Sequence, residues 1–149
     1  MKMKKLVTIL LLLAATITGI KAQDADKIVG TYRADYADNS SRIKIEKAAD
    51  GTYFGKAIWV KNCLDKNGNK ILDKKNPDKS LRSVPCDRVK ILWGVKYNAE
   101  KNCWDGGKIY DPTRGIRANV SINFQPNGRL RVRGSVMGIG ESVYWDKLD

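Results

Sequence analysis

The chain contains no histidine among its 149 residues. This absence removes the usual general base near neutral pH, every catalytic pair built on imidazole, and imidazole ligands for metals. A glycine-rich phosphate-binding loop is also missing, because Gly138-Ile139-Gly140 is typical of a turn. We therefore expect a protein that is not an enzyme, and we expect neither a cofactor nor a metal.

A carboxylate pair and a cysteine nucleophile are the catalytic devices that remain. The strand carboxylates Glu46, Asp105 and Glu141 are scattered along the chain, as solvated surface charges usually are. A hydrolase is the competing hypothesis, and it needs these carboxylates to converge in one cleft. A nucleophilic Cys103 has no imidazole to activate it.

Cysteine is scarce, with three residues in the chain. Cys63 and Cys86 bracket a long polar segment, whereas Cys103 falls in an expected hairpin turn. Three pairings are possible, and each leaves one thiol free. We favour a Cys63–Cys86 disulfide with Cys103 unpaired, since closing the loop would order it and stabilise the fold by about 3–4 kcal/mol.

Long apolar runs are absent after residue 22, and the one before it has the features of a secretory leader. A basic head over residues 1–5 precedes an apolar stretch over residues 6–20, and Ala22 offers a small residue for cleavage. We interpret residues 1–22 as a signal peptide and residues 23–149 as one domain, periplasmic or secreted and not an integral membrane protein. An uncleaved anchor is the alternative.

Acidic residues are outnumbered by basic ones. Removing residues 1–22 takes away four lysines and no acid, so the net charge falls from +12 to +8. The basic residues are dispersed and match no nucleic-acid motif, and export would separate them from nucleic acid. An anionic envelope component is the more plausible partner. A candidate anionic-surface row comprises Arg117, Arg129, Arg131 and Arg133, and a solvated face is the alternative.

What the chain has in abundance is alternation of period two. Over residues 116–124, five apolar residues alternate with Arg117, Asn119, Ser121 and Asn123, which indicates a strand with one buried face. Similar runs separated by turns predict about eight strands and an antiparallel up-and-down β-barrel, with a β-sandwich as the alternative. The expected strands cover residues 28–34, 42–47, 53–61, 89–97, 104–110, 116–125, 129–136 and 141–148. Gly106-Gly107 predicts a bulge or a close backbone approach.

The aromatic residues are the candidate ligand-binding group. A period of two places several of them on inward faces, including Trp93 on a face shared by alternate residues from Val89 to Tyr97. A small barrel either fills its interior with side chains or keeps room for one apolar ligand. Core packing and a lined pocket are both open interpretations. The candidates are Tyr32, Tyr53, Trp59, Trp93 and Trp145.

The polar segment over residues 62–87 is the one long irregular connection. Within it, residues 65–73 place oxygen-bearing side chains at alternate positions, as calcium sites do. Lys70 and Asn76 occupy the positions at which an EF-hand needs glycine and glutamate. Asn, Asp and Gly also make ordinary turns, so both interpretations stand.

Several segments together resemble a known family. They are residues 73–82, 91–94, 106–112 and 130–134, and Trp145 follows them. Over residues 28–148 the chain resembles the exported bacterial proteins grouped as domain-of-unknown-function family 2147 (DUF2147). The resemblance implies a lipocalin-like barrel in the periplasm with no established activity or catalytic residues. Lipocalins typically carry Gly-x-Trp in the first strand, where this chain has Gly30-Thr31-Tyr32.

These observations favour a carrier or sensor of a small apolar or amphipathic molecule. The alternative is an envelope module with a solid barrel that binds a protein, an anionic lipid or a glycan. Such a module would use its basic face or its long loop.

Overall fold

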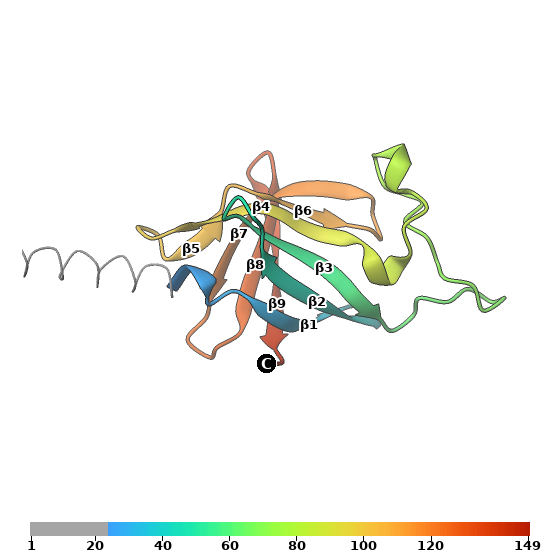
Figure 1. The fold of residues 1–149 in the computed structure, drawn as a ribbon, viewed down its shortest axis with the longest axis horizontal. Helices are drawn as coiled ribbons and strands as arrows, with labels where there is room; N and C mark the ends of the chain where they lie inside the picture. Colours follow the sequence, from blue (N-terminus) through green and yellow to red (C-terminus); the bar gives the residue numbers. More distant parts are fainter. Residues whose placement is uncertain (1–23) are drawn as a thin grey trace, which may run out of the picture.

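The alternating runs of the sequence form the strands of a computed structural model, which describes residues 24–149. A short helical turn at residues 24–26 precedes the first strand. Figure 1 shows strands that wrap around one another, with a long excursion between β3 and β4. The strands are β1 (Gly30–Tyr36), β2 (Asn39–Lys47), β3 (Tyr53–Val60), β4 (Lys90–Asn98), β5 (Cys103–Asp105), β6 (Lys108–Asp111), β7 (Ile116–Phe124), β8 (Leu130–Val136) and β9 (Ile139–Lys147).

Antiparallel pairing closes these strands into a barrel. The strands pair around the sheet from β1 to β9, and β9 returns to β1 through the pair Ala34↔Trp145. Both β5 and β6 pair with β4 and with β7, so together they occupy one position in the barrel. The result is an eight-position antiparallel barrel with one extra strand, which confirms the predicted barrel and excludes the sandwich.

The interruption between β5 and β6 lies at Gly106-Gly107, as the sequence predicts. A Cβ atom on Gly107 would lie 2.3 Å from the carbonyl oxygen of Trp93, so the backbone between β5 and β6 touches the backbone of β4 there. Only glycine allows this approach.

Most predicted strands lie within two residues of their observed bounds. The first strand, expected at 28–34, occupies Gly30–Tyr36. The polar segment at 36–41, expected as a turn, instead begins β2 at Asn39, because the turn itself needs only residues 37 and 38. Ile28 precedes β1 and packs into the barrel end.

One half of the barrel is filled with side chains and closed by the N-terminal turn. The indole Nε1 of Trp104 donates to the carbonyl of Ala25 at 2.9 Å, and the Tyr53 hydroxyl donates to Asp26 at 2.5 Å. Fully or nearly buried residues fill the space beneath this turn. They are Ile28, Tyr32, Ile45, Tyr53, Leu92, Val95, Trp104, Val120, Ile122 and Leu130. We call this half the closed end.

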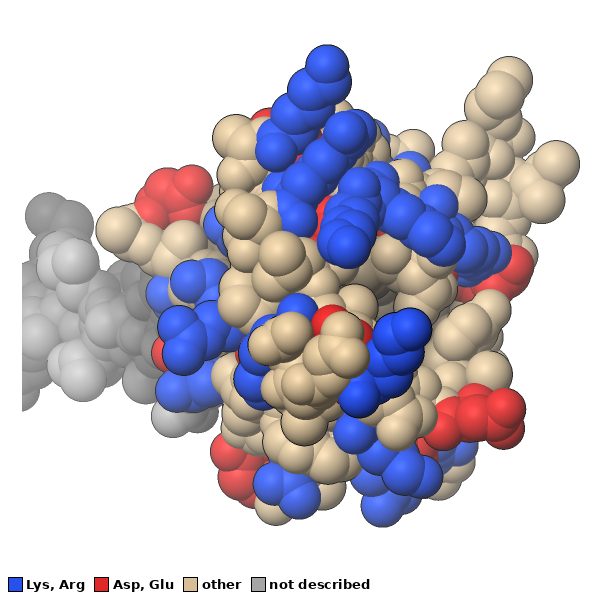
Figure 2. Space-filling model, turned by 90° about the vertical axis from the view of Figure 1, so that its right-hand side faces the viewer, with Lys and Arg blue, Asp and Glu red and all other residues tan. Residues whose placement is uncertain are grey.

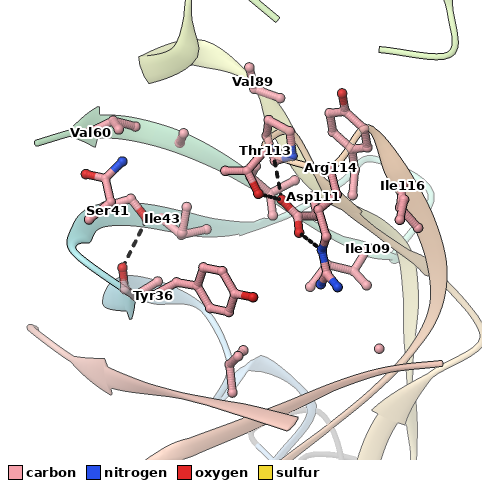
Figure 3. A pocket seen from close by; sticks show the side chains of 18 of the residues that line it. Tyr36, Ser41, Ile43, Val60, Val89, Ile109, Asp111, Thr113, Arg114 and Ile116 are labelled. Carbon is pink, nitrogen blue, oxygen red and sulfur yellow. Dashed lines mark hydrogen bonds and ion pairs between the residues drawn. The ribbon is translucent and has the colours of Figure 1, made fainter. Parts of the chain in front are cut away.

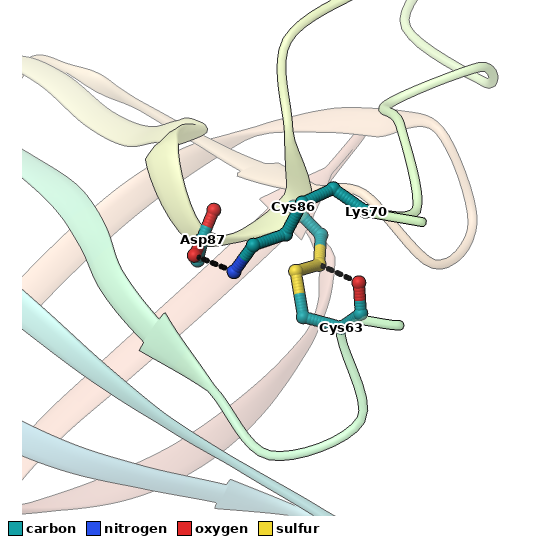
Figure 4. Close-up of a disulfide and its surroundings, with 4 residues drawn as sticks. All are labelled: Cys63, Lys70, Cys86 and Asp87. Carbon is teal, nitrogen blue, oxygen red and sulfur yellow. Dashed lines mark hydrogen bonds and ion pairs between the residues drawn. A yellow bond between two sulfur atoms is a disulfide. The ribbon is translucent and has the colours of Figure 1, made fainter. Parts of the chain in front are cut away.

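The long connection between β3 and β4 is fastened by the predicted disulfide. Cys63 and Cys86 are bonded, and Cys103 is a free, buried thiol, so both cysteine predictions are confirmed. Figure 4 shows the disulfide beside the ion pair that joins Lys70 to Asp87. We call residues 62–88 the disulfide loop. It contains two short 3-10 turns, η1 (Lys79–Leu81) and η2 (Cys86–Arg88).

A buried carboxylate ties the disulfide loop to the barrel. Asp73 is 4% exposed, and its Oδ1 accepts a 2.7 Å hydrogen bond from the Tyr110 hydroxyl on β6. Its Oδ2 accepts a second bond of 2.7 Å from the Asn76 side-chain amide. Burial, followed by the bond to Asp73, raises the pKa of Tyr110. Both carboxylate oxygens are therefore satisfied away from water, as a buried charge requires.

Removing the Tyr110 hydroxyl should weaken the attachment of the loop. We expect Tyr110→Phe to lower the free energy of unfolding by about 1–3 kcal/mol, because the buried carboxylate loses a charge-assisted hydrogen bond. Tyr97→Phe is the matched control, since the Tyr97 hydroxyl bonds Asn102 on the exposed surface. Urea unfolding and trypsin cleavage within residues 66–82 measure both effects. Equal stability of the two variants would contradict this role for Asp73.

The stability of the closed end should depend on pH through the ionisation of Asp26. Bonds from Tyr53 and then from Lys47 hold the pKa of Asp26 below its usual value, against a smaller effect of burial. A carboxylate with a lowered pKa in the folded state stabilises the fold above its unfolded pKa of about 3.9, and this stabilisation is lost as the pH falls through the folded pKa. We expect Asp26→Asn to destabilise the protein at neutral pH.

The difference between Asp26→Asn and the parent should begin to shrink below a pH of about 4 and vanish as the pH falls through the lowered folded pKa, because the carboxylate of the parent is then protonated as well. Thermal unfolding across a pH series measures it. A difference that stays constant from neutral to acidic pH would refute the assignment.

Candidate ligand cavity

The half of the barrel opposite the closed end is hollow. It holds a cavity of about 1010 Å³, within the size range of sites for small organic molecules. Figure 3 shows side chains from several strands converging on this space. Its wall is mainly aliphatic and includes Ala34, Ile43, Ala57, Val60, Ile91, Ile109, Ala118, Val132 and Val143.

Strand β7 contributes apolar side chains to both halves of the barrel. Val120 and Ile122 are buried in the closed end, whereas Ala118 and Ile116 line the cavity. Ile116 is largely exposed because it lies at the open mouth. The apolar residues of the run 116–124 thus face inward, as predicted. Val120 and Ile122 face the packed closed end, whereas Ile116 and Ala118 face the cavity.

The mouth of the cavity is formed by three hairpin turns and by the disulfide loop. The turns connect β1 with β2, β6 with β7, and β8 with β9, and residues of all three line the cavity. From the loop, Ile71 and Leu72 form part of the wall. Sequence reasoning missed these two residues; Ile71 is 42% exposed and Leu72 is partly buried, and an adjacent aliphatic pair in a polar segment was the available signal.

A charged network lies at the mouth. The Arg114 Nε atom donates to Asp111 at 2.6 Å, and its Nη1 donates to Glu141 at 3.3 Å. The carboxylates raise the pKa of Arg114 above its usual value. Burial alone would raise the pKa of Asp111, but bonds from Thr113 and Arg114 hold it below the usual value. Lys75 adds a bond of 2.6 Å to the Thr113 carbonyl. An apolar interior therefore meets a charged rim.

Of the five aromatic candidates, Trp145 lines the cavity. It is 4% exposed, and its ring centroid lies 6.3 Å from that of Tyr32. Tyr32 and Tyr53 point inward but belong to the closed end, where the Tyr32 hydroxyl bonds the Ile28 carbonyl at 2.8 Å. Trp145 therefore stands at the boundary between the packed and the hollow halves.

The inward orientation predicted for Trp59 is wrong. Pairing between β2 and β3 shifts register at this point, since Ile43 pairs with Ala57 while Arg42 pairs with Trp59. The extra residue in β3 reverses the alternation, so Trp59 is 44% exposed and lies beneath the Arg42 guanidinium.

The inward orientation predicted for Trp93 is wrong for a similar reason, although Val89, Ile91, Val95 and Tyr97 of the same predicted face are buried, line the cavity or pack against the core. The β3–β4 register shifts twice, and Gly94 has a φ of +67°, a conformation that favours glycine. Leu92 and Val95 are consequently the fully buried residues of β4. Trp93 is half-buried and stacks with Arg117 instead of lining the cavity.

The candidate arginine row is not uniform. Arg129 bonds Asp146 at 2.8 Å near the closed end, and Arg117 contacts Trp93. Arg131 donates to the Ser142 hydroxyl at 3.1 Å, and the Arg133 guanidinium lies against Gly140. Among residues 24–149, neither Arg131 nor Arg133 forms an ion pair.

The carboxylates considered for catalysis or calcium binding take part in separate interactions. Glu46 pairs with Lys44, Glu141 pairs with Arg114, and Asp105 accepts from Asn98. Asp65 accepts from the backbone amides of residues 67 and 69, whereas Asp73 belongs to the Tyr110 network. Within the described residues there is no group of three or more Cys, Asp or Glu side chains arranged to hold a metal ion.

The described chain contains no helix that is long and apolar enough to cross a membrane. The predicted signal peptide at residues 1–22 lies outside the described residues, so export stays a prediction.

Comparison with known proteins gives both a structural neighbour and a family. The chain is similar to protein HP1028 from the human pathogen Helicobacter pylori, which is described as belonging to the lipocalin family. The two are 25% identical with a TM-score of 0.67, over 83% of this chain and 84% of the other. Curated protein sequences give no match.

The family model of an uncharacterised protein conserved in bacteria, DUF2147, matches residues 30–147. This match covers the whole barrel from β1 to β9. The chain therefore belongs to the DUF2147 family, and its fold is lipocalin-like.

Proposed function

We propose that this protein binds and carries a small apolar or amphipathic molecule in the cavity, without catalysis, outside the cytoplasm. The observation that carries the proposal is the cavity of about 1010 Å³ in a barrel whose other half is packed solid. A hollow of this size beside a well-packed core is not a packing defect, because interiors normally leave few voids larger than a water molecule.

The polarity of the cavity supports an elongated ligand with distinct ends. Aliphatic side chains form the deep wall, and Trp145 marks its inner boundary. Charged side chains, among them Arg114 and Glu141, lie at the mouth. A molecule with an apolar body inside and a polar group at the mouth would satisfy both regions.

The competing module with a solid barrel is less well supported, because its interior would have to be filled throughout. The absence of catalysis rests on the arrangement of the mouth. Its carboxylates Asp111 and Glu141 are both paired with Arg114, which keeps them from acting as a free acid and base. The location outside the cytoplasm rests on the predicted leader and on the disulfide, which favours an oxidising compartment.

Trp145 provides a specific test of occupancy. Fatty acids that carry bromine on the alkyl chain quench nearby indoles, and Trp145 is the tryptophan that lines the cavity. We expect brominated fatty acid to quench the emission of the parent in a saturable manner. Trp145→Phe should abolish most of this quenching.

Trp59→Phe is the matched control, because Trp59 lies on the outer face of β3 and should not report on the cavity. Ala118→Phe should weaken binding at least about tenfold, since the added ring fills space that the ligand needs. Quenching that survives in Trp145→Phe, or binding unchanged in Ala118→Phe, would rule out the cavity as the site.

Ligand identity can be sought in protein purified from its own envelope. Native mass spectrometry and solvent extraction should reveal a co-purifying molecule that is absent from Ala118→Phe. If no molecule co-purifies and apolar probes leave tryptophan emission unchanged, the carrier proposal fails.

A further inference from the structure

The tip of the β8–β9 hairpin exposes its largest apolar side chains to solvent. Met137 is 95% exposed and Ile139 is 83% exposed, the highest values among the large hydrophobic residues of the described chain. Val136 is about half exposed beside them. Val136 and Ile139 also line the cavity mouth, so this apolar tip adjoins the opening.

The turn at this tip is made from an unfavourable residue. Met137 has a φ of +52° and Gly138 a φ of +80°, and Val136 pairs with Ile139. Two left-handed residues between paired strands define a type I′ turn, whose best sequence is Asn-Gly. A non-glycine residue such as methionine is strained there. Folding alone would favour a small polar residue, so the methionine side chain calls for a role outside the fold.

The hairpin also separates from the neighbouring strand β1. Strand β9 pairs with β1 from Lys147 only as far as Trp145, so within the described chain its residues from Tyr144 to Ile139 have no backbone partner on that side. On the neighbouring β1–β2 hairpin, Tyr36 is half exposed and lines the same mouth. An amphipathic aromatic ring of this kind is common where proteins meet a membrane interface.

Two cationic side chains that form no ion pair within residues 24–149 lie behind the apolar tip. Arg133 and Arg131 are on the outer face of β8, and Arg133 lies against Gly140, which directly follows Ile139. Arg133 is four residues from Met137, a separation of about 13 Å along an extended strand. Apolar segments that bind at a membrane interface penetrate roughly 5–10 Å, which would leave the Arg133 guanidinium near the level of the phosphates, with Arg131 about 7 Å farther from the bilayer.

The wider charge of the molecule fits the same partner. Figure 2 views the side on which the disulfide loop lies, where Lys and Arg side chains spread over the middle and top and acidic ones lie mainly toward the margins. The disulfide loop carries seven basic and four acidic residues. At the mouth itself, Arg114 pairs with both Asp111 and Glu141, and Lys74 and Lys75 line the mouth together with Asp35 and Asp38, so charges of both signs lie near the hairpin.

We propose that the β8–β9 hairpin docks the open end of the barrel on an anionic phospholipid bilayer. Val136, Met137 and Ile139 enter the interfacial region, Arg133 contacts the phosphates, and Arg131 behind it adds to the attraction of the anionic surface. This orientation turns the cavity mouth toward the lipid. The docking rests on the hairpin and not on the contents of the cavity, so it is tested without any ligand.

Vesicle flotation of residues 24–149 measures the docking. This portion contains the nine described strands and both ends of the barrel, and it lacks the apolar run at residues 6–20 that would itself bind lipid. Vesicles of equimolar phosphatidylcholine and phosphatidylglycerol are compared with phosphatidylcholine alone. We expect the parent to float with the anionic vesicles, less so with the neutral ones, and less at high salt.

Two pairs of substitutions separate the apolar and the cationic contributions. Met137→Asn with Ile139→Thr keeps the local conformational preferences, and asparagine even favours the turn, so loss of folding does not explain its effect. It should weaken vesicle binding at least about tenfold. Arg131→Gln with Arg133→Gln should weaken binding to the anionic vesicles only, by about tenfold.

Leu148→Thr is the matched control, because Leu148 is also about half exposed but follows the opposite end of β9. It should bind as the parent does. The proposal is overturned if the parent remains with neither vesicle, or if the hairpin variant binds as well as the parent. A concentration-dependent dimer that the hairpin substitutions abolish, with no vesicle binding, would instead assign the tip to self-association.

The fatty-acid quenching assay on a hairpin variant keeps the two proposals apart. For this comparison the single substitution Met137→Asn is used: it should weaken vesicle binding and leave quenching equal to that of the parent, because Met137 does not line the cavity. Lost vesicle binding with intact quenching therefore concerns docking alone.

Discussion

The hydrogen bond from Tyr110 to the buried Asp73 carboxylate is the contact on which the open end of the barrel depends. A charge in an apolar setting must have its oxygens satisfied, and here the partners come from β6 and from the disulfide loop itself. This requirement holds the loop against the barrel, where Ile71 and Leu72 complete the cavity wall. The segments that carry the family resemblance, residues 73–82 and 106–112, meet at this bond. Two of the segments that carry the family resemblance therefore attach the disulfide loop to the barrel and so hold one wall of the cavity in place.

The two halves of the barrel differ in how their interiors are packed. At the closed end, buried aromatic and aliphatic side chains fill the interior, and the N-terminal turn covers them through Asp26 and Ala25. At the open end, the ladder between β1 and β9 stops at Ala34↔Trp145, and side chains line the wall instead of filling the interior. The packed half supplies the hydrophobic stabilisation, which leaves the hollow half free to accommodate a guest. Trp145 belongs to both, since it packs on Tyr32 and faces the cavity.

Much of this architecture was predictable from the sequence. Alternation of period two predicts the strands and their number, and the spacing of the cysteines predicts the disulfide, because both signals are local. The orientations of Trp59 and Trp93 were not predictable. Each depends on a register shift between paired strands, and pairing between strands is not written in the alternation of either one. Gly94 was a warning for Trp93, whereas no comparable residue precedes Trp59. The sequence could not decide whether the barrel is filled or hollow, since inward aliphatic residues such as Ala118 and Val132 suit a filled barrel equally well.

The disulfide has a consequence for when the protein becomes able to function. Cys63 and Cys86 close the loop that supplies one wall of the cavity, and cysteines in a reducing compartment stay as thiols. A newly made chain still in such a compartment would have this wall held by non-covalent contacts, among them the bond from Tyr110 to Asp73 and the bond from Lys75 to the Thr113 carbonyl. Oxidation of Cys63 and Cys86 to the disulfide then holds the loop in place and completes the cavity wall. In the proposed carrier, the cysteine pair thus makes completion of the cavity wall conditional on an oxidising compartment.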